Sequence, residues 1–171
     1  MRLLDPWQKV ENLAHINLDN LQMQGMDTLL LDMDNTVVPW HTFDIDASTY
    51  AWVSDAKARG FKICIISNNQ KWRIKRLTAM MGVEGVWNAC KPMLGGYIKA
   101  LKVLGSNKTT SVFVGDQLFT DILGANILGL KTILVMPLTR REFLWTRIMR
   151  RLETLVTGRA FGRKAAQRGS N

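Results

Sequence analysis

The sequence predicts an α/β fold: a doubly wound (Rossmann-like) sheet of five parallel strands with helices on both faces. Short apolar runs alternate along the chain with longer segments of helical periodicity, an alternation typical of parallel α/β proteins. A glycine follows each helical segment, as it often does at a helix C-terminus. At 171 residues and 47% hydrophobic residues the chain can bury a full core, so we expect a single domain, 1–171.

The predicted elements follow one another in a regular series. Strands are expected where short runs of apolar and β-branched residues occur, at 28–33, 61–66, 85–88, 110–115 and 131–135. Helices are expected between them, each ending before a glycine, at 47–59, 70–81, 94–104 and 118–128. Because a helix separates successive strands, the strands should lie parallel.

Two aspartates follow the first predicted strand, in the run Asp32-Met33-Asp34-Asn35-Thr36. Side chains alternate along a strand, so Asp32 and Asp34 should point to the same side. Like charges so close disfavour each other's ionisation unless a cation lies between them or one of them keeps a proton. This pattern fits one carboxylate as nucleophile and metal ligand and the other as general acid and base. The alternative is a pair of capping aspartates at a strand-to-loop turn.

Polar residues also follow the other predicted strands. The C-terminal ends of parallel strands share one edge of the sheet, where ligands of open α/β proteins bind. We therefore expect Asp116 to face Asp32. Carboxylates suit Mg²⁺, whereas a hydroxyl, an amide and an ammonium group suit phosphate oxygens. The residues collected at this edge are Asp32, Asp34, Ser67, Asn68, Lys91, Asp116 and Asp121.

The order of these motifs resembles that of the haloacid dehalogenase superfamily of phosphatases. The motifs are Asp-x-Asp-x-Thr at 32–36, Ser67 after the second strand, Lys91-Pro92, and Gly-Asp-x-x-x-Thr-Asp at 115–121. Four ordered motifs are more specific than any one of them. The resemblance covers residues 25–137, which we expect to form the catalytic α/β core.

The resemblance implies roles for the residues at this edge. Asp32 would be the nucleophile that forms an aspartyl-phosphate. Asp34 would protonate the leaving oxygen and then serve as the base that activates water. Lys91 would neutralise charge on the nucleophile and on the transferring phosphate. Ser67 would bind the phosphoryl group, with Asn68 beside it in the candidate substrate-binding set.

A magnesium site is implied by the same resemblance. Asp32, Asp116 and the backbone carbonyl of Asp34 would hold Mg²⁺, and Asp121 would either lie close to the metal or orient the lysine. Thr36 completes the candidate substrate-binding set, although a structural role is favoured there over a chemical one.

The spacing of the motifs leaves no room for a cap domain. Thirty residues separate Thr36 from Ser67 and twenty-three separate Ser67 from Lys91, which a helix and a strand nearly fill. Capped relatives close over small metabolites to exclude water. A capless site therefore favours a substrate too large to enclose, such as a phosphoprotein, a nucleic-acid end or a phospholipid headgroup. The alternative is that a partner chain covers the site.

The net charge of +9 is concentrated at the C-terminus. After Pro137, nine basic residues oppose only two glutamates, which predicts a basic amphipathic helix at 139–157 and a basic tail at 158–171. A basic helix that carries tryptophan is typical of a surface lying on anionic lipid. Its expected membrane-contacting residues are Arg140, Trp145, Arg147, Arg150 and Arg151. The alternatives are that its apolar face packs on the sheet or that its arginines bind nucleic acid.

A narrower resemblance covers nearly the whole chain. Leu4-Asp5-Pro6-Trp7, the run 17–21, the Asp-Met-Asp-Asn-Thr core and the run 138–147 are similar to those of the YqeG-type phosphatases. Some members of this group and its mitochondrial relatives are phosphatidylglycerophosphate phosphatases. The resemblance therefore implies an Mg²⁺-dependent phosphomonoester hydrolase that converts phosphatidylglycerophosphate to phosphatidylglycerol.

Two other functions remain open at this point. One is a phosphatase for a small metabolite or a phosphoprotein. The other, of a different class, is a basic adaptor for RNA or for a ribosome-assembly partner, against which the intact Asp32 and Asp34 argue. The chain begins without the apolar region of a signal peptide and has no stretch of about 18 apolar residues. We therefore expect a cytoplasmic protein that is either soluble or peripheral on the inner face of the membrane.

Overall fold

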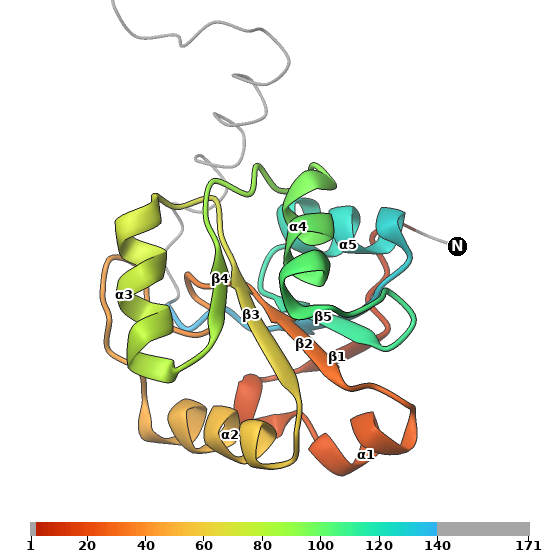
Figure 1. Ribbon diagram of the computed structural model, residues 1–171, viewed down its shortest axis with the longest axis horizontal. Helices are drawn as coiled ribbons and strands as arrows, with labels where there is room; N and C mark the ends of the chain where they lie inside the picture. The colour runs from red at the N-terminus through yellow and green to blue at the C-terminus, as the bar shows by residue number, and fades with distance from the viewer. Residues whose placement is uncertain (1–2, 140–171) are drawn as a thin grey trace, which may run out of the picture. The chain divides into compact units, whose positions relative to one another are not determined.

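The structure is a computed structural model that describes residues 3–139 (Figure 1). The described residues belong to one compact unit. Of the predicted helix at 139–157 only Thr139 is described, and the predicted tail at 158–171 lies outside the described residues. The five expected membrane-contacting residues, from Arg140 to Arg151, lie outside them as well.

Six parallel strands form one sheet in the described part of the chain. In spatial order they are β1 (Gln8–Val10), β6 (Lys131–Val135), β5 (Ser111–Gly115), β2 (Thr28–Leu31), β3 (Lys62–Ile66) and β4 (Glu84–Val86). The predicted α/β class and parallel sheet are confirmed, but the predicted number of five strands was wrong. The additional strand, β1, pairs with β6 at the edge of the sheet. It has three residues, only one of them apolar, so the sequence contains no strand-like run there.

Helices connect the strands. They are α1 (Leu18–Met23), α2 (Ala47–Ala58), α3 (Lys71–Met81), α4 (Gly95–Leu104) and α5 (Leu123–Leu128), with short helical turns η1 (Leu13–His15) and η2 (Leu118–Ile122). Asp46 caps the start of α2, because its side chain accepts the Thr49 backbone N–H at 3.0 Å. The predicted helical segment at 118–128 is present, with its first half, η2, in π-helical rather than α-helical geometry.

Alternating side chains of the central strands build a core on each face of the sheet. In β2, Leu29 and Leu31 belong to one core and Leu30 to the other. Helices α1, α2 and α3 pack on the first face, and α4 and α5 pack on the second. Figure 1 shows α3 and α4 on opposite sides of the strands. This is the doubly wound arrangement that the sequence predicts.

The direction in which the chain winds reverses at β2. From β2 the chain proceeds to β3 and β4 on one side, and then returns to β5 and β6 on the other. Open α/β sheets bind ligands in the crevice outside the C-terminal ends of the strands at such a switch point. β2 ends at Leu31 and the neighbouring β5 ends at Gly115. Asp32 and Asp116 therefore leave adjacent strands at the expected position of a site.

Candidate active site

Asp32 lies at the end of β2, directly beside β5. Its backbone N–H donates to the Val114 carbonyl at 2.8 Å, which continues the pairing of the two strands by one residue. The Asp32 side chain is buried, with 6% of its residue surface exposed. A carboxylate is thus held at the edge of the sheet by backbone hydrogen bonds rather than on a free loop.

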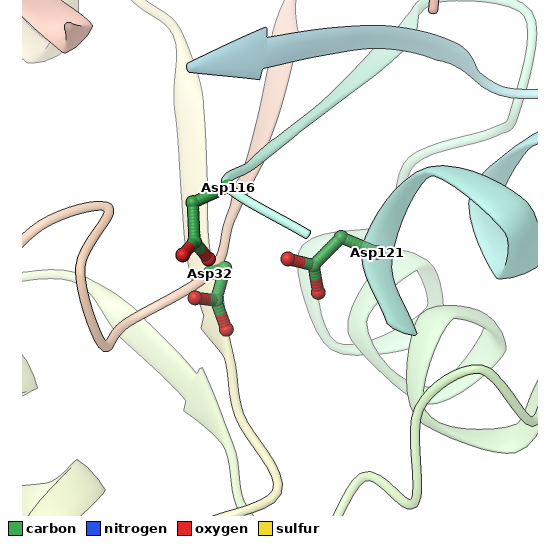
Figure 2. A group of neighbouring side chains, drawn as sticks. All are labelled: Asp32, Asp116 and Asp121. Carbon is green, nitrogen blue, oxygen red and sulfur yellow. The ribbon is translucent and has the colours of Figure 1, made fainter. Parts of the chain in front are cut away.

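Asp116 and Asp121 approach Asp32 from the adjoining connection (Figure 2). Asp116 follows β5, and the π-helical turn η2 brings Asp121 back toward it. Asp121 is fixed by the Gln117 backbone N–H, which donates to its Oδ2 at 3.1 Å. The close fit requires glycine at 115, because a Cβ there would lie 2.5 Å from Asp121 Oδ2. Carboxylate oxygens of Asp32, Asp116 and Asp121 lie within 4.8 Å of one another, and all three residues are buried.

Lys91 connects two of these carboxylates. Its Nζ donates to Asp121 Oδ1 at 2.6 Å and to Asp32 Oδ1. Asn68 holds the backbone of Lys91 from both sides: Asn68 Nδ2 donates to the Lys91 carbonyl at 3.1 Å, and the Lys91 N–H donates to Asn68 Oδ1 at 2.7 Å. The peptide bond between Lys91 and Pro92 is cis. Contacts to the Lys91 backbone and to its Nζ therefore hold the ammonium group in place.

The electrostatics of this group favour a bound cation. Burial, together with the charges of Asp32 and Asp121, raises the pKa of Asp116 to about 9. Burial also raises the pKa of Asp32 to about 7, although the Lys91 ammonium opposes this shift. Burial alone would lower the pKa of Lys91, but the charges of Asp121 and Asp32 raise it above its usual value. One ammonium group is thus too little positive charge for three buried carboxylates.

Asp116 identifies where a metal ion could bind. Neither of its carboxylate oxygens has a hydrogen-bond partner among residues 3–139, although both are buried. Buried carboxylates without partners are rare unless a cation or a water binds them. An all-oxygen group of this kind fits a hard divalent cation such as Mg²⁺. Asp32, Asp116 and Asp121 are the residues that could hold it.

Asp34 lies outside this carboxylate group and has its own partners. Arg73 Nη2 on α3 donates to Asp34 Oδ1 at 2.9 Å, and Asn69 Nδ2 donates to Asp34 Oδ2. The side chains of Asp34 and Arg73 are each about 10% exposed. The carboxylate of Asp34 is therefore separate from the three that could bind a metal, and only its backbone carbonyl remains a candidate ligand.

The other predicted site residues lie at the same edge of the sheet. Ser67 is buried after β3, and its Oγ accepts the Asn69 N–H at 3.1 Å. Thr36 is also buried, and its hydroxyl has no hydrogen-bond partner within the described residues. The segment after Asp34 forms a tight turn in which the Val38 carbonyl accepts the Asn35 N–H at 2.7 Å.

Three residues of the site were not predicted from the sequence. Asn69 and Arg73 contact Asp34, and Asn35 connects the turn to the segment after β6. Asn69 directly follows the predicted Ser67-Asn68 pair, which was a usable signal. Arg73 lies in the first turn of α3 on the same face as buried Ile74 and Leu77, an unusual position for arginine that the helical pattern could have indicated.

The site carries no cap domain in the described residues. The stretch between Thr36 and Ser67 contains α2 and β3, and the stretch between Ser67 and Lys91 contains α3 and β4.

None of the helices described in residues 3–139 has the length and apolar composition that a membrane span requires.

Comparison with known proteins gives a consistent set of matches. A family model described as HAD-hydrolase-like, for haloacid dehalogenase, matches residues 88–137. The protein named probable phosphatase YqeG from Bacillus subtilis (strain 168) is 33% identical over 148 residues, which are 86% of this chain and 86% of that protein. Phosphatidylglycerophosphate phosphatase 1, chloroplastic/mitochondrial, from Arabidopsis thaliana is 29% identical over 159 residues, which are 86% of this chain and 45% of that protein.

Solved structures agree on the fold. An uncharacterized protein from Listeria monocytogenes serotype 4b, known from its crystal structure, is 23% identical and gives a TM-score of 0.56. The likeness covers 68% of this chain and 84% of that one.

The fold and the buried charged site define a hydrolase of the haloacid dehalogenase type, and more narrowly a phosphatase. The chain belongs to the family of the YqeG phosphatase, to which it is 33% identical over 86% of its length.

Proposed function

We propose that this phosphatase is an Mg²⁺-dependent phosphomonoester hydrolase that acts through an aspartyl-phosphate on Asp32. The observation that carries the proposal is the buried group of Asp32, Asp116 and Asp121 beside the ammonium of Lys91. Asp116 offers two carboxylate oxygens that the described residues do not use. Asp32, Asp116 and Asp121, with the backbone carbonyl of Asp34, would hold the ion. When bound, Mg²⁺ would offset the charge of the carboxylates and of the substrate phosphate.

In the first step, a carboxylate oxygen of Asp32 attacks phosphorus and the bond from phosphorus to the leaving oxygen breaks. Asp34 transfers a proton to that oxygen, and the alcohol departs. In the second step, Asp34 takes a proton from water, the water oxygen bonds to phosphorus, and the bond from phosphorus to Asp32 breaks. Inorganic phosphate is released, and both carboxyl groups return to their starting states.

Two further side chains support this chemistry. Lys91 contacts Asp32 and would reduce the repulsion between the nucleophile and the anionic phosphate. The Ser67 hydroxyl already accepts a backbone N–H, and its own proton would donate to a phosphoryl oxygen. Asn68 grips the backbone of Lys91, and its contribution would therefore be to place the lysine.

Phosphatidylglycerophosphate is the substrate that we propose. The Arabidopsis relative, named for this activity, is 29% identical over 159 residues, and the chain carries a net charge of +9, which favours an anionic surface. Without a cap in the described residues, a headgroup that stays attached to a membrane could still enter the site. The predicted basic helix, with Arg140, Trp145, Arg147, Arg150 and Arg151, would supply the contact with anionic lipid.

The test is phosphate release from a panel of substrates, with Mg²⁺ and with a chelator. The panel holds short-chain phosphatidylglycerophosphate, phosphatidic acid, glycerol 3-phosphate, a phosphopeptide and a 5′-phosphorylated RNA. We expect kcat/KM for phosphatidylglycerophosphate to exceed the others by at least about tenfold, equal to about 1.4 kcal/mol of transition-state stabilisation, and to vanish with the chelator. Asp32→Asn, prepared in the same way, controls for contaminating phosphatase. A higher kcat/KM for any other member of the panel would contradict the lipid substrate.

A further inference from the structure

We propose that Arg73 is a positioning residue for Asp34, holding that carboxylate in the orientation from which it reaches the leaving oxygen. The proposal rests on the acid and base role of Asp34 in the proposed function. Neither the motif at 32–36 nor the comparisons assign a role to Arg73, which lies on α3, far from Asp34 in the sequence.

The contacts fix both oxygens of the Asp34 carboxylate. Arg73 binds Oδ1 at 2.9 Å, and Asn69 binds Oδ2 from the other side. With a donor on each oxygen, rotation of the carboxylate about its bond to Cβ breaks at least one hydrogen bond. A carboxyl group has about four lone-pair positions, so these two contacts leave others free to carry the proton that Asp34 transfers. Because the side chains of Asp34 and Arg73 are each about 10% exposed, water competes little for the bond between them.

The two buried cations of the site pair with different carboxylates. Lys91 bonds to Asp32 and Asp121, whereas Arg73 forms its only ion pair within the described residues with Asp34. Asp34 is thereby held apart from the carboxylates that could bind a metal. A planar guanidinium suits this role better than an ammonium group, because its donors have fixed directions.

Arg73 has a second set of contacts that could be purely structural. Its Nη2 also donates to the Thr42 carbonyl at 3.1 Å, and its guanidinium lies 4.9 Å from the centre of the Phe43 ring. Arg76, one helical turn further along α3, lies 4.5 Å from the same ring. Arg76 is exposed and forms no ion pair with any carboxylate of residues 3–139. Arg76 is therefore a matched control: it shares the contact with Phe43 but not the contact with Asp34.

The test compares substrates whose leaving groups differ in their need for a proton. An alkyl phosphate needs protonation of its leaving oxygen, whereas 2,4-dinitrophenyl phosphate does not. For Arg73→Gln we expect kcat/KM to fall about 10- to 100-fold on the alkyl phosphate and less than about threefold on the dinitrophenyl ester, since general acid catalysis contributes about 100-fold or more. Arg76→Gln should leave both values near those of the wild type. Arg73→Lys keeps the charge but not the planar guanidinium. Its kcat/KM on the alkyl phosphate should lie between that of Arg73→Gln and that of the wild type.

A double-mutant cycle separates positioning from structure. If Arg73 acts through Asp34, then Arg73→Gln should have no further effect in an Asp34→Asn background. Equal losses on both substrates, or the same additional loss in the Asp34→Asn background, would overturn the proposal. If Arg73→Gln does not fold, Arg73→Lys carries the same comparison of substrates. Asp34→Asn alone tests the proposed function: wild-type activity of that variant on the alkyl phosphate would remove Asp34 from the acid role, whatever Arg73 does.

Discussion

The ammonium group of Lys91 bonds to the carboxylate of Asp121 at 2.6 Å, with both side chains almost fully buried. The same ammonium group also bonds to Asp32. A buried cation shared by two carboxylates cannot be removed without leaving uncompensated charge, and breaking a buried pair in this way costs about 3–5 kcal/mol. The pair therefore matters to the stability of the fold as well as to the chemistry.

Lys91→Met tests that relationship. We expect it to lower the free energy of unfolding of the metal-free protein by about 3–5 kcal/mol and to abolish phosphatase activity. Urea unfolding followed by circular dichroism measures the first effect. Lys108→Met, at an exposed lysine in the loop before β5, should change the free energy of unfolding by less than about 0.5 kcal/mol. Equal urea midpoints for Lys91→Met and wild type would show that the buried pair contributes nothing to stability.

The raised pKa values of Asp116 and Asp32 predict that the metal-free protein loses stability as the pH rises. In the unfolded chain both carboxyls have the ordinary aspartate pKa of 3.8, whereas in the folded protein the pKa of Asp116 is about 9 and that of Asp32 is about 7. At pH values between 3.8 and about 9, the folded state binds more protons than the unfolded state. The free energy of unfolding therefore falls with rising pH, by up to about 1.4 kcal/mol per pH unit for each group.

Thermal unfolding in a chelator should show this slope, with a lower midpoint at pH 8 than at pH 5.5. Mg²⁺ should raise the midpoint at pH 8 and have little effect at pH 5.5, because the ion competes with protons for the carboxylates. Asp116→Asn should flatten the dependence, since it removes the group with the larger shift. A chelated wild type that gains stability from pH 5.5 to pH 8 would contradict the assignment.

Asn35 joins the turn after Asp34 to the segment that follows β6. The Leu138 N–H donates to the Asn35 carbonyl at 3.1 Å, and the Thr139 hydroxyl donates to Asn35 Oδ1 at 2.5 Å. Asn35 is fully buried and has a φ of 62°. Thr139→Val should leave Asn35 Oδ1 without this donor and cost about 1–3 kcal/mol, whereas Thr139→Ser should be nearly neutral. Chemical denaturation of the two variants measures the difference, and equal stabilities would exclude a contribution from the hydroxyl.

The part of the site that could be predicted from the sequence is the part fixed by strand topology. Asp32 and Asp116 come together because each follows a buried strand and the two strands are parallel neighbours. Once the strand ends are located, side-chain alternation and the shared edge of a parallel sheet are enough to place both residues. Lys91 and Asp121 follow from the same reasoning with the addition of the motif order.

The part that could not be predicted depends on how far long side chains reach across the fold. Arg73 contacts Asp34 from a helix 39 residues along the chain, a contact set by packing rather than by a local pattern. Asn68 was grouped with substrate-binding residues because of its position, but its side chain binds the Lys91 backbone. β1 was missed because an edge strand of three residues buries too little to leave an apolar run.

The proposed contact with the membrane predicts a difference between lipid and soluble substrates. Each arginine near an anionic surface contributes about 1 kcal/mol, so Arg140, Arg147, Arg150 and Arg151 together would contribute about 4 kcal/mol. Replacing the four with Gln should weaken co-sedimentation with anionic vesicles by roughly a thousandfold in partitioning. Activity on lipid phosphate should fall, while hydrolysis of p-nitrophenyl phosphate should stay near the wild-type value. High salt should have the same effect as the substitutions, because it screens surface charge.

Four exposed lysines on the side of the sheet away from the candidate active site serve as a matched charge control. Lys57, Lys62, Lys102 and Lys108 are exposed and lie near the N-terminal ends of the strands or the C-terminal ends of the helices. Replacing these four lysines with Gln removes the same charge but should leave vesicle binding closer to that of the wild type. If both quadruple variants lose vesicle binding equally, the attraction is a property of the net charge. If the arginine variant loses activity on both substrates in parallel, its arginines act on the fold rather than on the membrane.

If Asp32 is the nucleophile, it becomes phosphorylated during turnover, and trapping that aspartyl-phosphate tests the proposed mechanism directly. Asp34→Asn should slow hydrolysis of an aspartyl-phosphate, while 2,4-dinitrophenyl phosphate lets the intermediate form without a proton donor. We would mix the Asp34→Asn variant with 2,4-dinitrophenyl phosphate and Mg²⁺ and quench the reaction in acid. Reduction with borohydride and mass spectrometry then identify the modified peptide. We expect conversion of Asp32 to homoserine in a fraction approaching one per enzyme molecule, and none in a variant that also carries Asp32→Asn. Dinitrophenol release without modification of Asp32, or wild-type turnover by Asp32→Asn, would contradict it.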